Sequence, residues 1–360
     1  MISQAEAFAR IRLARSPNVG PVSFGQLLRR FGDAQSALDA LPDLAARGGA
    51  RYRPAPRDTI EAEIVATRKA GARYLFHDSA DYPPLLAELD SAPPVLIVRG
   101  DSSLAAKPCV ALVGARNASA AAIKLARDLA VELSAEGYVV VSGLARGIDG
   151  AAHRGGLPLT IGVIASGIDI VYPPQHAELQ EEIAKRALLV SEQPPGTEPR
   201  GSHFPTRNRI IAGIAAGTVV VEAAPKSGSL ITARLAGEAG REVMAVPGSP
   251  LDARSHGCNQ LIREGAVLVQ CAADVIELVA GFDGNPRSTF RESAPSVFDF
   301  SDEVSEPADL AALLTTAPVG IDELIRQSGE GAAAVQMALL ELELAGRLQR
   351  HAGGRVSLTA

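Results

Sequence analysis

The spacing of apolar side chains changes along the chain, and each pattern predicts a different kind of structure. In residues 1–75, apolar positions recur near a period of 3.6, which is typical of amphipathic helices. The clearest run comprises Leu27, Leu28, Phe31, Ala34, Leu38 and Leu41. We therefore expect a small helical N-terminal domain over residues 1–75.

From residue 76 the pattern becomes a series of short, continuous apolar runs separated by amphipathic helices. "CVALVG" at 109–114 is one such run, and "YVVVSG" at 138–143 is the next. Strands that are apolar along their whole length are buried on both faces, as in a parallel sheet covered by helices. The pattern predicts an α/β fold over residues 76–280, with a doubly wound Rossmann-like parallel sheet.

The C-terminal part of the chain has two further patterns. Residues 281–306 show no period and are rich in Pro, Ser and acidic residues, which predicts a mobile linker. Residues 307–360 then read as three helices and a hairpin, an order that resembles a winged helix. The third helix has no Lys or Arg, and Glu341 and Glu343 would repel a DNA groove, so we expect a protein-contact or regulatory role for it. Arg347, Arg350 and Arg355 near the hairpin leave weak contact with a DNA backbone open.

Composition and charge narrow the function classes. No run approaches 18 apolar residues, which predicts no membrane span. Cys109, Cys258 and Cys271 are widely separated and lack a zinc-binding spacing, so we expect free thiols in a cytoplasmic protein. The net charge of −6 is concentrated in residues 276–360, which hold 6 Lys/Arg against 13 Asp/Glu. An anion site in the middle of the chain must therefore come from local clustering.

Small and basic residues follow the predicted strands, at the edge of the sheet where ligands of such folds bind. They are Gly114, Arg116 and Ser119 after the first strand of the parallel sheet, and Ser142, Gly143 and Arg146 after the second. Glycine turns that open into helices expose N–H groups, and arginines add charge-assisted bonds to phosphate oxygens. We predict a phosphate-bearing ligand here. Neither a G-x-G-x-x-G turn nor a Walker A pattern is present, so NAD and ATP are not expected.

The stretch "HFPTRNRIIAGIAAGTVVVEAAPKSGSLITA" at 203–233 adds two more arginines. Arg207 and Arg209 are two residues apart and point to different sides of a helix. We expect one of them to form an internal ion pair, with Glu192 or Glu222 as its partner. The other is expected to face the phosphate edge.

A catalytic interpretation requires an acid–base pair or an activated nucleophile. Asp149 and His153 lie four residues apart on one helical face, but a structural role is favoured, with Asp149 capping the helix and His153 packed behind it. Ser227 and Ser229 are compatible with a nucleophile turn and equally with a helix N-cap. No catalytic residue is predicted.

Several long motifs occur in one order and together resemble the DNA-processing protein A (DprA/Smf) family. They are "VGARNAS", "SGLARGIDGAAH", "GIDIVYPPQH", "SEQPPGTEP", "FPTRNRIIAGIAAGTVVVEAAPKSGSLITA" and "VPGSP…SHGCNQLIREGA". The resemblance covers residues 75–275 and, more loosely, both flanks. In the N-terminal flank, "NVGPVSFGQLLRRFG" is similar to a helix-hairpin-helix or sterile-alpha-motif-like unit, for which phosphate contact and ordinary helical packing both stay open.

The resemblance implies a protein without catalytic activity that binds and protects single-stranded DNA and loads the RecA-type recombinase in natural transformation. It also implies a homodimer formed through the Rossmann-like domain, and neither metal nor cofactor. The implied DNA pocket consists of Gly114, Arg116, Ser119, Ser142, Gly143 and Arg146, with Arg207, Asn208 and Arg209 beside it. Where many relatives carry a lysine before His-Phe-Pro, Arg200 is the nearest cation. Tyr172 and Phe204 are the aromatic residues near these loops.

Two other functions compete with this interpretation. Nucleoside-monophosphate phosphoribohydrolases of the lysine-decarboxylase-like type share the Rossmann variant, but carry a Pro-Gly-Gly-x-Gly-Thr turn followed by a catalytic Glu. This chain has "KSGSLITA" at 226–233 instead, which favours DNA binding. A transcription regulator that uses the winged helix is disfavoured by the acidic third helix.

Overall fold

The short apolar runs of the middle segment form one nine-stranded sheet in the computed structural model, which describes residues 2–282, 310–351 and 353–359. The chain divides into two units, residues 63–292 with this sheet, and residues 1–62 together with 293–360. Apart from residues 281 and 282, the predicted linker at 281–306 lies outside the described residues. Each unit has its own apolar core, so each is described separately.

The sheet is doubly wound, as predicted. Its strand order is β1-β2-β6-β5-β4-β3-β7-β8-β9, and neighbouring strands from β6 to β9 are parallel, whereas β2 pairs antiparallel with β6 and β1 with β2. The order in which successive strands are added to the sheet reverses between β3 and β7, which places the ligand-binding crevice of this fold class at their carboxyl ends. The strands are β1 (Arg73–Phe76), β2 (Val95–Gly100), β3 (Cys109–Val113), β4 (Val139–Ser142), β5 (Thr160–Ile164), β6 (Leu188–Ser191), β7 (Gly217–Val220), β8 (Glu242–Ala245) and β9 (Val267–Leu268).

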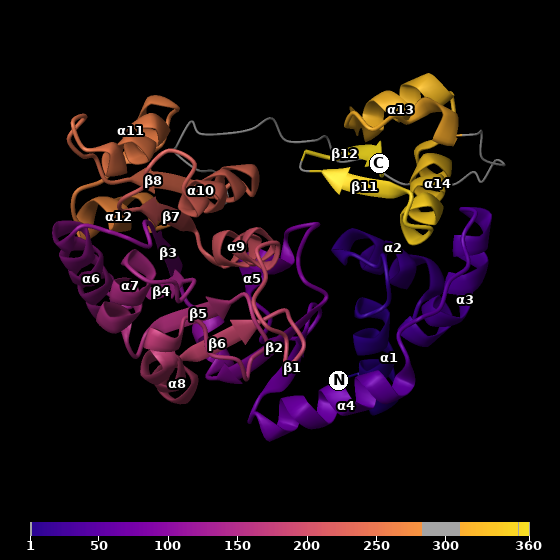
Figure 1. The fold of residues 1–360 in the computed structure, drawn as a ribbon, viewed down its shortest axis with the longest axis horizontal. Helices are drawn as coiled ribbons and strands as arrows, with labels where there is room; N and C mark the ends of the chain where they lie inside the picture. Colours follow the sequence, from indigo (N-terminus) through magenta and orange to yellow (C-terminus); the bar gives the residue numbers. More distant parts are fainter. Residues whose placement is uncertain (1, 283–309, 352, 360) are drawn as a thin grey trace. The chain divides into compact units, whose positions relative to one another are not determined.

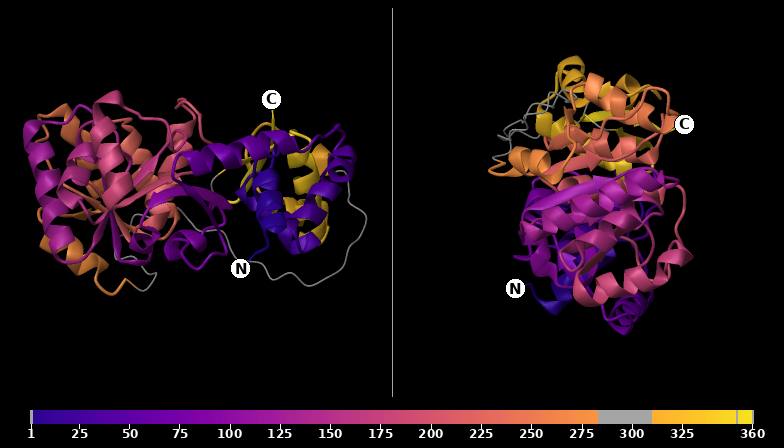
Figure 2. Two further views of the ribbon diagram at one scale, coloured as in Figure 1. Left: turned by 90° about the horizontal axis from the view of Figure 1, so that it is seen from below. Right: turned by 90° about the vertical axis from the view of Figure 1, so that its left-hand side faces the viewer.

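Helices cover both faces of the sheet (Figure 1, Figure 2). Helices α6, α7 and α12 share one aliphatic core with the sheet, and α8, α9 and α10 share the other. The strands are buried on both faces because each face is covered, which explains their continuous apolar sequences. The helices of this unit are α5 (Pro84–Ala87), η1 (Ser102–Ala106), α6 (Ala120–Ala135), α7 (Ile148–Gly156), η2 (Pro174–His176), α8 (Ala177–Arg186), α9 (His203–Ile214), α10 (Gly228–Glu238), η3 (Ala253–Ser255), α11 (His256–Arg263) and α12 (Ala272–Val279).

The other unit contains both ends of the chain. Its N-terminal helices are α1 (Gln4–Ala14), α2 (Pro21–Phe31), α3 (Ala34–Arg47) and the first part of α4 (Arg57–Lys69). The predicted apolar face is confirmed, since Leu27, Leu38 and Leu41 are buried in its core. The C-terminal elements are η4 (Leu310–Leu313), β10 (Val319–Gly320), α13 (Ile321–Ser328), α14 (Ala332–Leu344), β11 (Leu348–His351) and β12 (Arg355–Leu358).

These C-terminal elements form the predicted winged helix with one difference. Within the described residues, the first of the three predicted helices is only the short 3-10 helix η4. Its continuation is blocked because the Thr315 hydroxyl accepts a hydrogen bond from Ala317 N at 3.1 Å, and Pro318 follows. The hairpin turn lies at Gly353 and Gly354, whose φ angles of 73° and 62° are suited to glycine.

The structure tests two further predictions, that the three cysteines are free thiols and that no segment spans a membrane. Cys109 and Cys258 are buried free thiols and Cys271 is an exposed one, as the sequence spacing predicts. Burial raises the pKa of the Cys109 and Cys258 thiols to about 12, so neither is a reactive thiolate at neutral pH. In the part of the chain that the structure describes, no helix combines the length and the apolar character that crossing a bilayer requires.

Candidate functional site

The predicted loops meet at the carboxyl ends of β3 and β4. These strands are parallel neighbours, and Ile148 N donates a hydrogen bond to Ala115 O at 3.3 Å across the two loops. The approach is so close that a Cβ on Gly147 would lie 2.2 Å from the Ala115 carbonyl oxygen. The φ of Gly147 is +74°, so glycine is required there on both counts.

Two carboxylates of the protein itself accept hydrogen bonds from backbone N–H groups of these loops. Asp149 accepts hydrogen bonds at Oδ2 from Gly143 N at 3.2 Å and Ala145 N at 3.3 Å. Glu222, just after β7, accepts from Ser119 N at 3.0 Å and from Ser119 Oγ at 2.7 Å. The amides at these positions are therefore bound within the protein. These three amides are not available to an anion at this edge.

The predicted cap at Asp149 is wrong in detail. Gly147 is the N-cap residue of α7 and no side chain bonds to that helix end, because Asp149 turns back to the preceding loop. Burial raises the pKa of the Asp149 carboxyl, while the Arg207 guanidinium acts in the opposite direction. The carboxylate therefore organises the loop after β4.

Arg207 lies beneath the edge instead of facing it. Its side chain is buried, and its Nη1 donates to Gly143 O at 2.6 Å and also to Val163 O. A Cβ on Gly143 would lie 2.3 Å from Arg207 Nη1, so the guanidinium fits in this place because residue 143 has no side chain. Burial lowers the pKa of Arg207 to about 10, which leaves the guanidinium charged at neutral pH. Arg207 thus holds the chain at the ends of β4 and β5.

The neighbours of Arg207 on α9 are also bound within the fold. Arg209 Nη2 forms an ion pair with Glu192 Oε1 at 2.5 Å, which confirms the predicted internal ion pair for one of the two arginines. Asn208 Nδ2 donates to Gly228 O at 3.3 Å and so connects α9 to the start of α10. Ser142 is fully buried, with its Oγ donating to Leu112 O at 2.6 Å. These predicted site residues support the edge from below.

The exposed part of the edge is cationic and aromatic. Arg116, Arg146 and Arg200 are all exposed. The Arg116 guanidinium carbon lies 4.9 Å from the centroid of the Phe204 ring, within the range of a cation–π contact. The Phe204 ring is in turn 5.7 Å from that of Tyr172. Both rings border a small recess with Gly143, Ala145, Ser166 and Pro199.

The alternative catalytic interpretations find no support in the geometry. Thr160 Oγ1 donates to Val140 O at 2.7 Å, so it must accept the 2.7 Å hydrogen bond from His153 Nδ1. Burial lowers the pKa of His153 to about 3, and the ring is neutral and packed inside. Ser227 occupies the predicted N-cap position of α10, but it makes no cap bond, and its Oγ is 2.9 Å from Ser229 Oγ.

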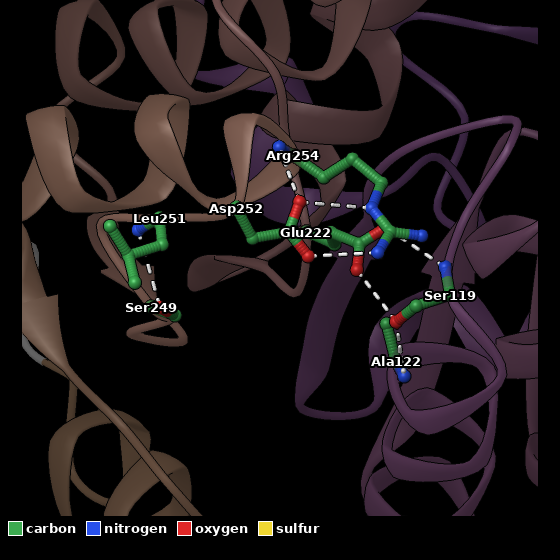
Figure 3. Close-up of polar contacts among 7 residues, drawn as sticks. All are labelled: Ser119, Ala122, Glu222, Ser249, Leu251, Asp252 and Arg254. Carbon is green, nitrogen blue, oxygen red and sulfur yellow. Dashed lines mark hydrogen bonds and ion pairs between the residues drawn. The ribbon is translucent and has the colours of Figure 1, made fainter.

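Sequence reasoning missed one cation at this edge. Figure 3 shows the exposed Arg254 side chain extending from the short helix η3, which follows β8, toward Glu222 and Ser119. Asp252 pairs with Arg254 at 2.8 Å and, together with the weaker influence of Glu222, raises the pKa of its guanidinium. The same strand-end rule that selected Arg116 also applies to the loop after β8, so its arginine was open to prediction.

Comparison with known proteins assigns the family. A family model described as DNA recombination-mediator protein A matches residues 73–280. Two further models, described as a DprA-like N-terminal HHH domain and a DprA winged helix domain, match residues 4–66 and 301–354. The chain belongs to the DNA recombination-mediator protein A (DprA/Smf) family. The family consists of DNA-processing proteins and not of catalytic enzymes, which removes the phosphoribohydrolase hypothesis.

Individual relatives agree with this assignment. Protein Smf of Escherichia coli K12 is 35% identical over 337 residues, which are 90% of this chain and 88% of that protein. The X-ray structure of DNA processing protein A from Streptococcus pneumoniae has a TM-score of 0.64 and 36% identity, covering 77% of this chain and 98% of that one. A Helicobacter pylori structure, described in terms of the single-stranded DNA binding mode of DNA processing protein A, has a TM-score of 0.54 and 28% identity over 59% of this chain and 98% of that one.

Proposed function

We propose that the protein binds single-stranded DNA along the carboxyl edge of its sheet and acts as a recombination mediator. The observation that carries the proposal is the exposed Arg116 guanidinium over Phe204, with Tyr172 beside it. A cation next to aromatic faces suits a strand whose phosphates need charge and whose unpaired bases need a surface to stack on. The single-stranded DNA binding described for the Helicobacter pylori relative supports the same assignment.

The residues of the site divide into two roles in this proposal. Arg116, Arg146 and Arg200 contact the phosphates directly, because they are the exposed members of the predicted set. The others shape the loops that carry these arginines, namely Gly114, Ser119, Ser142, Gly143, Arg207, Asn208 and Arg209. Binding through side-chain charge and stacking is tolerant of sequence and sensitive to salt.

The cellular role in the proposal follows from the family. We expect the protein to protect incoming single strands and to load the RecA-type recombinase in the cytoplasm during natural transformation, as a homodimer formed through the unit of residues 63–292. Such a role requires neither metal nor cofactor. Among the residues that the structure describes, no three His, Cys, Asp or Glu side chains are grouped so as to hold a metal ion.

A salt series with fluorescent oligonucleotides tests the proposal. Affinity for single strands of different sequence should be similar, and log K should fall linearly with log salt concentration. The same preparation, with a RecA-type recombinase and a single-strand-binding protein, should shorten the lag of recombinase filament formation. Oligonucleotide affinity that does not depend on salt would contradict the DNA site, and an unchanged lag would contradict the loading role alone.

A further inference from the structure

Helix α14 is the third helix of the winged helix, and it is buried on more than one face. Its residues divide between two apolar cores. Val335, Leu339 and Leu342 pack in the core of the winged helix itself. Leu340 and Leu344 belong instead to the core formed by α1, α2 and α3. A helix that is apolar on opposite sides has two partners, and here both lie in the same chain.

Polar contacts surround the second of these apolar faces. On the α2 side, Gln26 Nε2 donates to Gln336 Oε1 at 2.9 Å. At the C-terminal end of α14, Asn18 Nδ2 donates to Leu344 O at 3.1 Å, which satisfies a carbonyl left open at the helix end. Arg347 Nη1 donates to Gly48 O at 3.3 Å in the opposite direction. Hydrogen bonds therefore run both ways across the contact.

The backbones of α3 and α14 approach each other at Gly48. A Cβ at this position would lie 2.3 Å from the Glu341 carbonyl oxygen and 2.8 Å from Ala345 Cβ. The φ of Gly48 is −73°, which any residue adopts, so glycine is needed there for space and not for conformation. Glycine at such a point indicates a closely packed contact, where even a methyl group has no room.

The charges of α14 fit protein packing and not a phosphate backbone. Glu341 is buried at the contact, 3.6 Å from Arg47 of α3. Glu343 pairs with Arg350 of β11 at 2.9 Å, and burial raises the pKa of its carboxyl. In helix-turn-helix proteins the corresponding helix enters the major groove and needs an exposed, cationic or polar face. That face is absent from the described residues of α14.

We infer that α14 is a protein-docking helix whose partner is the N-terminal helical domain of the same chain. Through α14 the winged helix packs against the N-terminal helices α1, α2 and α3, and this helix is therefore not available to a DNA groove. This inference is independent of the proposed DNA site, since none of the contacts that carry it involves residues 63–292.

Cleavage of the intact protein between the two segments tests the docking. A protease recognition sequence inserted after residue 290 allows the full chain to be cut once, and gel filtration then shows whether residues 291–360 stay with the remainder. We expect them to stay together without a covalent link. Separation of the two pieces would overturn the inference.

A matched pair of glycine variants localises the contact. Gly48→Ala should weaken retention of the C-terminal piece by about tenfold or more, because the methyl group clashes with the backbone of α14. Gly25→Ala in α2 is the control, since its Cβ would meet only Arg29 Nη1, at an ordinary 3.7 Å. Equal retention in the two variants would contradict the docking geometry. A gain of duplex-DNA binding in Gly48→Ala would contradict it too, because α14 would then be a DNA-binding helix that the N-terminal helices cover in the unaltered protein.

Cross-linking distinguishes docking within a chain from docking between two chains. In a Cys271→Ser background, which removes the exposed thiol, Gln26→Cys and Gln336→Cys place two thiols at a hydrogen-bonded pair. A short bis-maleimide should join them within one chain. On a denaturing gel the product is then a monomer whose mobility differs from that of the unlinked chain, because the cross-link closes a loop. A cross-linked dimer, or no cross-link at all, would overturn the assignment of the partner.

Discussion

Two surfaces of this protein occupy positions where related folds bind nucleic acid, the carboxyl edge of the sheet and helix α14 of the winged helix. At the sheet edge, arginines are exposed and one of them lies over an aromatic ring. On α14, the apolar residues are packed on two sides and the two carboxylates are paired with arginines. The fold class alone would nominate both surfaces, and the state of their side chains separates them.

The same distinction applies within the sheet edge. Arg207 and Arg116 are both close to the loop after β4, and each influences the pKa of Asp149. Arg207 donates hydrogen bonds to main-chain carbonyl oxygens, whereas Arg116 is exposed beside Phe204. A basic residue in a motif is therefore a ligand candidate only when its donors are not already engaged.

Loss of Arg207 should have the largest effect, and it should be on folding. Arg207→Met leaves the Gly143 and Val163 carbonyls without their donor and Asp149 without its compensating charge, so we expect a loss of about 3 to 5 kcal/mol in unfolding free energy. Urea unfolding measures it, with the exposed Arg146→Met as the control. Equal unfolding midpoints for both variants would mean that Arg207 is not a scaffold residue.

Arg116→Ala should leave stability almost unchanged and weaken binding to single strands of every sequence. We expect a loss of about 2 kcal/mol, or roughly thirtyfold in affinity, and a salt slope reduced by about one. Arg116→Lys keeps the charge but not the planar group over Phe204, and should recover only part of the loss. Normal affinity in Arg116→Ala, measured by anisotropy, would remove the sheet edge as the DNA site.

Phe204→Leu separates stacking from charge at the same position. It keeps an apolar side chain but removes the ring beside Tyr172, so we expect about 1 kcal/mol less binding free energy, or about fivefold in affinity. The salt slope should stay that of the unaltered protein. A slope that falls as in Arg116→Ala would show that the ring acts only by placing the arginine.

Arg254→Ala should have a smaller effect, about threefold in affinity, because its charge is already partly neutralised by Asp252. Asp252→Asn is the matched opposite, since it frees the guanidinium and should strengthen binding by a similar factor. Anisotropy at low salt resolves both. If both variants bind as the unaltered protein does, the DNA path does not include the loop after β8.

The smallest effect is expected on the winged helix. Arg355, next to the hairpin turn, is the basic residue there whose removal tests backbone contact directly. Arg355→Ala should change single-strand affinity by less than about twofold. A loss comparable to that of Arg116→Ala would abolish the distinction between the two surfaces.

Several features could be read from the sequence because they depend on local patterns. The runs 109–114 and 138–143 are almost entirely apolar, as is typical of strands covered on both faces, and they contain β3 and β4. The carboxyl edge followed from the alternation of strands and helices. Residues two apart on a helix point to different sides, which predicts an internal ion pair for one of Arg207 and Arg209, and the structure pairs Arg209 with Glu192.

The sequence by itself determined the family, the order of elements and the edge where the basic residues gather. Tertiary structure decided which polar groups at that edge are free. Asp149 and Glu222 bind amides predicted for phosphate, and Arg207 turns inward, because a buried charge or amide must find its nearest partner in space, not in sequence. The docking of α14 on the N-terminal helices is likewise a contact between opposite ends of the chain, which no local pattern records.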